Sequence, residues 1–346
     1  TLRLAGEDAT LINATTTKTI MGTSLSAADG TIFRNGTNFV IQMGHGSENT
    51  NNTVEWLIDE YLTFEGNNRV TSGLVGLQYL RLTDLTLQTD NKTVNLNGPI
   101  TLNGTVTFDT LSNQIVRLNN GSGYLTGSGD LVKEGTGRVE FRANIPDWKG
   151  GLVINQGDVY ALNQADVLGT GHLLGKTITL GSTEEAGTAR LLLQNPDTIQ
   201  NWAVEINHDI NVTYNPAQTK TLGMETAGNG NLISFNGAIT LNDNLVIYMN
   251  DGAEVGGSQN YVNFNGPIKD GTLTSGNITF FGDDAGGAND NTSGRTVNYA
   301  VLNADNSLWT GDVHISANTT YDQDQTTVVR LGHAKALNPV NDVTMN

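Results

Sequence analysis

Apolar and polar residues alternate with a period of two in many short runs of this chain. Because successive side chains of a β-strand point to opposite faces, such runs predict strands with one apolar and one polar face. A charge buried on the apolar face is expected to cost several kcal/mol. The residues that we expect to point into a core are Ile100, Leu102, Phe108, Ile154, Ile239, Leu241, Ile247 and Phe280.

An Asn-Gly motif between an apolar residue and a new strand occurs three times, at 96–100, 235–239 and 264–268. Asn-Gly is the strongest local signal for a β-hairpin, so the strands could form a sandwich of hairpins. In a parallel β-helix the same turns would instead stack from coil to coil, and their Asn side chains could bond in ladders. The motif alone leaves both folds open.

A long internal repeat favours the β-helix. The segment 138–181 reappears in degraded form at 296–345, with Trp148 opposite Trp309, and the segment 1–20 matches the back half of the unit. Residues Thr319 to Thr327 look like a loop insertion. Long-period repetition arises naturally in a solenoid and is not needed in a single sandwich. Both Trp residues should serve packing, with the ring closing over a turn where Gly lets the backbone approach.

The predicted fold is therefore all-β: a right-handed parallel β-helix, or β-solenoid, of roughly 20–25 residues per coil. We expect residues 1–346 to form one continuous solenoid with two long degenerate repeats, about 1–158 and 159–328, and a third copy starting near 328. The chain is further expected to continue at both ends, either covalently or by end-to-end stacking, because a β-helix cut inside a coil exposes unpaired strand edges.

Composition supports this fold and excludes several functions. The chain has 41 Gly, only 6 Pro and 15% charged residues, which suits strands and tight turns. A formal net charge of −17 argues against nucleic acid and anionic membranes as partners. The absence of cysteine excludes disulfides, Cys-ligated zinc and a Cys nucleophile. No apolar stretch is long enough for a membrane span, so membrane insertion by this chain is not expected.

Residues 124–171 contain the pattern Gly-x-Gly-x-Leu-x-Lys-x-Gly, then a strand, then aromatic-x-Gly-Gly. This pattern resembles the passenger-associated repeat of autotransporters. The resemblance implies a β-helical, extracellular protein of the bacterial cell surface, and says little about activity because such repeats occur in adhesins and in protease and lipase passengers. The residues that carry it are Gly127, Gly129, Leu131, Lys133, Gly135, Trp148, Gly150, Gly151, Gly157 and Leu168-Gly169.

Two acidic turns are candidates for a calcium site. Asp283, Asp284 and Asp290 lie in one Gly-rich turn, and Asp322 and Asp324 lie in another. Clustered carboxylate and amide oxygens suit a hard cation. Neither the EF-hand spacing nor a calcium-binding nonapeptide is present, so a solvated loop is the favoured interpretation.

No catalytic residues are expected. His45, in Gly44-His45-Gly46-Ser47, and the Asp283-Asp284 pair resemble motifs of β-helical polygalacturonases, but they lie far apart in the sequence and in reverse order. None of the five His lies beside a Gly-x-Ser-x-Gly elbow. Glu55, Asp59 and Glu60 lie beside Trp56 and Tyr61 in what we interpret as an ordinary strand.

The leading hypothesis is a structural or adhesive extracellular rod or fibre segment of a bacterial surface protein. Its partners would be itself or further repeats end to end, and surface glycans. The competing hypothesis is a carbohydrate-binding or carbohydrate-active β-helix, a glycoside hydrolase or lyase. Carboxylates and aromatic rings clustered on one face of adjacent coils would favour the second hypothesis.

Overall fold

The computed structural model divides the chain into two compact units, Thr1–Val153 and Ile154–Asn346. Side chains are described only within residues 105–345. The described residues are 2–3, 18–20, 23–25, 31–34, 39–42, 58–65, 68–71, 77–89, 93–96, 100–110, 112, 115–118, 125–142, 148–162, 176–195, 203–226, 232–251, 259–283, 297–317 and 326–345.

The described part of the chain is a β-solenoid without a helix. Every ladder whose register is described is parallel, except the antiparallel pair of β2 (Lys18–Ile20) and β3 (Thr23–Leu25). Parallel neighbours cannot be joined by a tight hairpin, so the chain must travel round a coil before it returns to the same sheet. The predicted parallel β-helix is confirmed, and the sandwich of hairpins is excluded.

The first unit stacks its strands in two parallel sheets. One sheet runs β1-β5-β7-β8-β10-β13, with β4 and β6 joined through β8 and with β12 on β10; the other runs β9-β11-β14. The strands besides β2 and β3 are β1 (Leu2–Arg3), β4 (Thr31–Arg34), β5 (Phe39–Gln42), β6 (Ile58–Glu65), β7 (Asn68–Thr71), β8 (Leu77–Thr89), β9 (Thr93–Leu96), β10 (Ile100–Thr110), β11 (Ile115–Leu118), β12 (Leu125–Gly127), β13 (Asp130–Glu134), β14 (Arg138–Phe141) and β15 (Leu152–Ile154) at the boundary.

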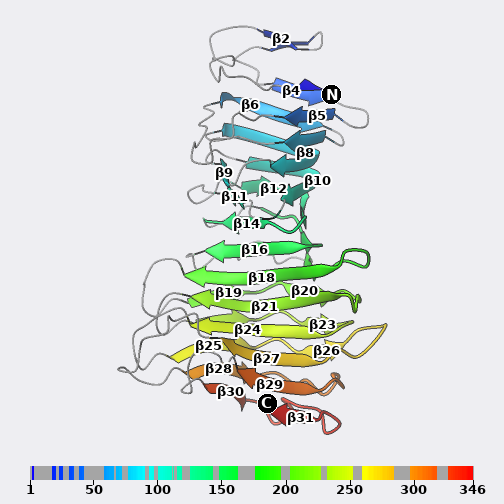
Figure 1. Ribbon diagram of the computed structural model, residues 1–346, viewed down its shortest axis with the longest axis vertical. Helices are drawn as coiled ribbons and strands as arrows, with labels where there is room; N and C mark the ends of the chain where they lie inside the picture. Colours follow the sequence, from blue (N-terminus) through cyan, green and yellow to red (C-terminus); the bar gives the residue numbers. More distant parts are fainter. Residues whose placement is uncertain are drawn as a thin grey trace. The chain divides into compact units, whose positions relative to one another are not determined.

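The second unit has three parallel sheets, and the chain visits them in turn. The sheets run β17-β20-β23-β26, β16-β18-β21-β24-β27-β29-β31 and β19-β22-β25-β28-β30 (Figure 1). Its strands are β16 (Gly157–Leu162), β17 (Thr177–Leu180), β18 (Gly187–Asn195), β19 (Ala203–Ile206), β20 (Asp209–Val212), β21 (Gln218–Thr226), β22 (Leu232–Phe235), β23 (Ile239–Leu241), β24 (Leu245–Asp251), β25 (Gln259–Phe264), β26 (Ile268–Asp270), β27 (Ile278–Asp283), β28 (Val297–Leu302), β29 (Val313–Ala317), β30 (Thr326–Leu331) and β31 (Val343–Met345).

The coils of the second unit are longer than predicted. Register pairs Ile210 with Ile239 and Ile239 with Ile268, and the bonded corner residues Asn236 and Asn265 have the same sequence separation of 29. The expected period of roughly 20–25 residues is wrong there. One such coil passes through a strand of each of three sheets, namely β20, β21 and β22 with 4, 9 and 4 residues. Connection length is free to vary because the ladder constrains only the strands.

The proposed loop insertion is also partly wrong. Thr326 and Thr327, its last two residues in the interpretation from sequence, begin β30 and pair with Val297 and Asn298 of β28. These Thr residues precede Val328 and Val329, and a run of β-branched residues favours a strand. The rest of the predicted insertion lies outside the described residues.

The core is made by apolar columns that run from coil to coil. Leu191, Leu222, Ile247 and Phe280 occupy consecutive ladder positions, and each is fully buried. The period-two prediction is confirmed for the six residues whose side chains are described, namely Phe108, Ile154, Ile239, Leu241, Ile247 and Phe280. Ile100 and Leu102 lie in β10 as expected, but their side chains lie outside the description.

The Asn-Gly motifs at 235–239 and 264–268 form corners of the coil, and the turn of the third motif lies outside the described residues. The turn at Asn236-Gly237 joins β22 to β23, which belong to different sheets. A Cβ atom on Gly237 would lie 2.0 Å from the carbonyl oxygen of His208 in the preceding coil. Glycine is therefore required at Gly237 by the close approach of two coils. The hairpin interpretation of this motif fails because β22 and β23 belong to different sheets.

An Asn ladder links four successive corners. Asn236 donates from Nδ2 to Oδ1 of Asn207 at 2.6 Å, and Asn265 donates to Asn236 at 2.8 Å. Asn303 continues the series onto Asn265 at 2.9 Å. Each amide can both donate and accept, so the side chains at successive corners bond to one another. The expectation of stacked Asn turns is confirmed for this ladder.

The two repeat-related Trp residues are packed in the same way. Trp148 is 2% exposed and donates from its indole nitrogen to the carbonyl oxygen of Gly129 at 2.8 Å, just before β13. Trp309 is fully buried and donates to the carbonyl oxygen of Gly276 at 2.8 Å, just before β27. The sequence-based prediction that both rings serve packing is confirmed.

A glycine two residues after each Trp makes this contact possible. A Cβ atom on Gly150 would lie 1.8 Å from the carbonyl oxygen of Gly129, and one on Gly311 would lie 2.0 Å from that of Gly276. No side chain fits at either distance. The Trp-x-Gly pattern thus encodes one local contact between coils, and each unit contains an example of it.

We predict that Trp309→Phe lowers the free energy of unfolding by about 1–3 kcal/mol, because the ring is retained while the buried carbonyl oxygen of Gly276 loses its indole donor. Urea denaturation measures the change. The neighbouring variant Leu308→Ala is the control: this side chain is 71% exposed, and the expected change is within about 0.5 kcal/mol. Equal effects of the two variants would contradict the packing role.

Candidate functional site

The structure does not test the calcium candidates. Asp283 ends β27, and its side chain lies outside the description. Asp284, Asp290, Asp322 and Asp324 lie outside the described residues altogether. Within the described part of the chain, no three His, Asp or Glu side chains come together as a metal site. The two acidic turns stay a prediction.

The other candidates from the sequence do not assemble into a site among the described residues. His45 with its Gly-rich turn, His172, Glu55 and Trp56 lie outside them, and Asp59, Glu60 and Tyr61 are placed only as backbone of β6. The three described His residues are separate: His208 is buried at a corner, His314 is half-buried in β29, and His333 is exposed.

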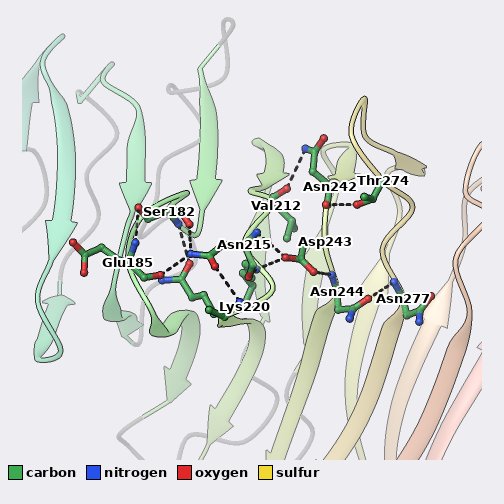
Figure 2. Close-up of polar contacts among 12 residues, drawn as sticks. Ser182, Glu185, Val212, Asn215, Lys220, Asn242, Asp243, Asn244, Thr274 and Asn277 are labelled. Carbon is green, nitrogen blue, oxygen red and sulfur yellow. Dashed lines mark hydrogen bonds and ion pairs between the residues drawn. The ribbon is translucent and has the colours of Figure 1, made fainter.

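A buried polar network fills the turns that lead into β18, β21, β24 and β27. Its centre is Lys220, whose side chain is fully buried and donates from Nζ to Oδ2 of Asp243 at 2.7 Å and to the carbonyl oxygen of Asn215 (Figure 2). The backbone N–H of Asn215 donates to the same Oδ2 at 2.7 Å. The side chain of Asn215 in turn donates to the carbonyl oxygens of Ser182 and Glu185 in the preceding coil.

Hydrogen bonds of the network lower the pKa of the Asp243 carboxyl group and keep it ionised. Burial alone would raise the pKa of Asp243, but hydrogen bonds from Lys220 and from the N–H groups of Asn244 and Asn215 outweigh burial, so the pKa lies below its usual value. An ionised carboxylate beside a buried ammonium is a matched pair. A pair of this kind specifies one geometry for the turns and offers neither a proton nor an open position to a substrate.

A second ladder runs through the same turns. The N–H of Asn277 donates to Oδ1 of Asn244 at 2.9 Å, and the N–H of Asp312 donates to Oδ1 of Asn277 at 2.8 Å. The N–H of Asp342 donates to Oδ1 of Asp312 at 3.1 Å. Figure 2 shows the first of these steps. Polar turn side chains are thus used for contacts between coils.

Buried lysines were missed in the sequence-based interpretation, although a signal existed. Lys220 shares the period-two face of Leu222 and Met224, which places it in the core. Lys133 shares the face of Leu131, is fully buried, and donates from Nζ to the carbonyl oxygens of Glu134 and Gly135 at 2.6 Å each. A lysine at an inward-facing position of a period-two strand pattern indicates that its ammonium group bonds to carbonyl oxygens of a turn.

Polar and aromatic residues also meet on the outer face of the sheet containing β16, β18 and β21. Arg190 binds Asp158 through two bonds of 2.6 Å, which raise the pKa of the guanidinium. Tyr160 donates to Glu225, which lies two strands further along the sheet. This is the combination of rings and carboxylates on adjacent coils that a carbohydrate site would use.

Stacking limits what the aromatic rings of this face can bind. Tyr160 is 1% exposed and packs with Leu192 and Tyr248. Tyr248 and Phe281 stack with centroids 6.1 Å apart and planes at 15°. A ring that stacks on another ring has only one face left to bind a sugar. The main role of these residues is therefore packing between coils.

Comparison with known proteins assigns no family. A scan against family models found no match, and searches of curated proteins and of solved structures found none either. Within the described residues, no helix has the length and apolar character needed to span a membrane. The chain folds as a β-solenoid, and the motif residues Trp148 and Gly150 make contacts between its coils.

We predict that Lys220→Met lowers the free energy of unfolding by about 3 kcal/mol or more, because it leaves the carboxylate of Asp243 without its cation. Adding Asp243→Asn should recover part of the loss. Lys335→Met is the matched control: Lys335 and Asp305 form an ion pair that is 63% and 44% exposed, and its loss should have little effect on stability because solvent screens the pair. Urea denaturation of the four proteins decides the matter.

We predict that the buried His208 makes the stability of the fold fall at acidic pH. Burial lowers its pKa to about 4, although the nearby Asp209 carboxylate acts in the opposite direction. The unfolded chain therefore binds this proton near pH 6.5 and the folded chain only near pH 4, so stability falls as the pH drops through that window. The expected loss is roughly 3 kcal/mol.

The measurement is urea denaturation at pH 7 and at pH 4.5 for the wild-type chain and two variants. His208→Gln should remove the pH dependence of this window, while His333→Gln, at an exposed position, should keep it. Acidification that affects the wild type and His208→Gln equally would refute the assignment. The Asp243 contribution is lost as the pH falls from 3.8 towards its own lowered pKa, which is below the His208 window, so the two effects occur in separate pH ranges.

Proposed function

We propose that this chain is a structural or adhesive segment of an extracellular bacterial surface protein, in which stacked β-coils provide length and stiffness. The observation that carries the proposal is that the motif residues resembling the passenger-associated repeat make contacts that build coils. Lys133 caps a turn, Trp148 bonds to the coil before it, and Gly150 permits the approach. A motif used in this way suits a scaffold.

The polar ladders support the same proposal. Asn207, Asn236, Asn265 and Asn303 satisfy one another across four corners, so each coil offers the next a matching surface. Solenoids propagate by nearest-neighbour contacts of this kind. We infer that the partners of the chain are further coils, either repeats of a longer protein or other copies of itself, and that surface glycans contact its outer faces.

The test measures whether the chain is exposed at the cell surface and whether it mediates attachment of the cells, in the organism that encodes it. Protease added to intact cells should remove the chain while a cytoplasmic marker survives, and cells lacking the gene should lose attachment to glycan-coated surfaces or to one another. Reintroducing the gene should restore attachment. A chain that is protected in intact cells and accessible only after lysis would overturn the extracellular role.

The second candidate is a carbohydrate-binding or carbohydrate-active β-helix. The observation in its favour is the outer face on which Tyr160 meets Glu225 and Arg190 meets Asp158. Incubation of the purified chain with acidic and neutral polysaccharides, followed by analysis of chain length, tests for cleavage. Cleavage that is lost in Glu225→Gln and kept in Glu184→Gln, at an exposed position, would favour this candidate over the scaffold.

A further inference from the structure

Three arginines surround one buried glutamate on the outer face of β11 and β14. Register places Arg117 of β11 directly opposite Glu140 of β14. The alternating neighbours Val116, Leu118, Val139 and Phe141 are buried in the core, which leaves Arg117, Arg138 and Glu140 on the outside. Arg142 follows Glu140 with the same alternation and bonds to the same carboxylate.

The carboxylate of Glu140 is the fixed centre of the cluster. Its side chain is 2% exposed, and Oε2 accepts from Nε of Arg117 at 2.9 Å and from Arg142 at 2.8 Å. Arg138 approaches Oε1 at 3.4 Å. The arginine side chains remain 29%, 31% and 36% exposed, so they are held at their inner ends and open to solvent on the outer side.

The cluster contains more positive charge than an ion pair needs. The formal charges of these four side chains sum to about +2, because arginine stays protonated at neutral pH. The pair of Arg190 and Asp158 shows what simple neutralisation looks like: one guanidinium, one carboxylate and two bonds. The residues at the matching positions of β9, Thr93 and Asn95, add no charge.

This local charge is opposite to that of the whole chain, whose formal net charge is −17. A positive patch on an acidic protein attracts an anionic group at short range, while the negative charge elsewhere on the chain does not hold the rest of a polyanion. Within the described residues, the Nη groups of Arg117 make no hydrogen bond. They are available to a ligand.

We propose that Arg117, Arg138 and Arg142 bind a sulfate ester carried by an extracellular acidic glycan. Guanidinium groups present N–H donors in a planar fork that matches the oxygens of such a group. A sulfate ester carries no proton at neutral pH and needs donors alone. A phosphate monoester would bring an O–H that requires an acceptor, and Glu140, the carboxylate described in this cluster, already accepts from the arginines. A phosphodiester carries no O–H but presents only two unbridged oxygens, whereas a sulfate ester presents three to the donors.

The inference rests on the proposed extracellular function, which supplies the glycan. Glu140 orients the three arginines, so the ligand meets donors that are already in place, and less side-chain entropy is lost on binding. A structural role for the cluster would need only that Glu140 be neutralised. Binding of sulfate by the surplus donors is therefore the property that separates the two roles.

The test uses the purified 346-residue chain and immobilised heparin as the sulfated probe. Hyaluronan, which carries carboxylates and no sulfate, and poly(glycerol phosphate), which carries phosphodiesters, are the comparison probes. We expect heparin to bind at least about tenfold more tightly than either polymer, with affinity falling as salt is raised. Stronger binding to poly(glycerol phosphate) would overturn the choice of sulfate, and equal binding to all three would overturn a specific site.

Variants assign the binding to the cluster. Arg117→Gln and Arg142→Gln should each weaken heparin binding about tenfold, and Arg117→Lys should recover only part of it because the planar fork is lost. Arg330→Gln, at an exposed position on β30, removes the same charge elsewhere and should leave binding unchanged. Thermal denaturation of each variant confirms that it is folded; if Arg117→Gln is not, Arg117→Lys and Arg142→Gln carry the comparison.

Failure of the inference is separable from failure of the proposed function. Absence of heparin binding, or an equal loss in Arg330→Gln, would refute the sulfate site even if protease treatment of intact cells placed the chain at the surface. Conversely, a chain that bound heparin through Arg117 and Arg142 but was protected in intact cells would refute the extracellular role and leave the binding site standing.

Discussion

The parallel stacking of coils is the constraint on which the rest of this protein depends. Parallel strands lie about 4.8 Å apart, so every position meets its equivalent in the next coil. An apolar residue then needs an apolar column, as at Leu222, Ile247 and Phe280. A polar group at a corner needs a partner of its own kind, as the Asn ladder provides at Asn236 and Asn265. The residue type at one position therefore constrains the residue types at the equivalent positions of the neighbouring coils.

Charge inside the solenoid follows from the same constraint. A lysine that extends inward cannot reach water, so Lys220 must find an anion and backbone carbonyls within the turns. Asp243 of the next coil supplies the anion, and its own N–H partners keep it ionised. On the outer face, Glu140 is surrounded by more positive charge than it needs, from arginines that remain half-exposed. This surplus positive charge is the reason why we propose that the face binds an anionic group.

Close approach explains why glycine and tryptophan recur together. At Gly150 and Gly311 a side chain would collide with the carbonyl oxygen that the Trp indole binds. The two residues therefore act as a unit, one filling the gap between coils and the other permitting it. The unit can recur while the surrounding sequence diverges, because the contact involves backbone of the neighbouring coil and no particular side chain.

The sequence by itself determined strands with inward apolar faces, because a period of two is a local signal. Stacked Asn corners were predicted only when the long repeat was considered together with the turn motif. The sequence also placed Trp148 and Trp309 in packing roles. Only the tertiary structure decided which coils meet: that Lys220 lies beside Asp243, that Arg117 lies opposite Glu140, and that the coils at the Asn-Gly corners are longer than expected. Those facts depend on register between segments that are distant along the chain, which variable corner lengths conceal in the sequence.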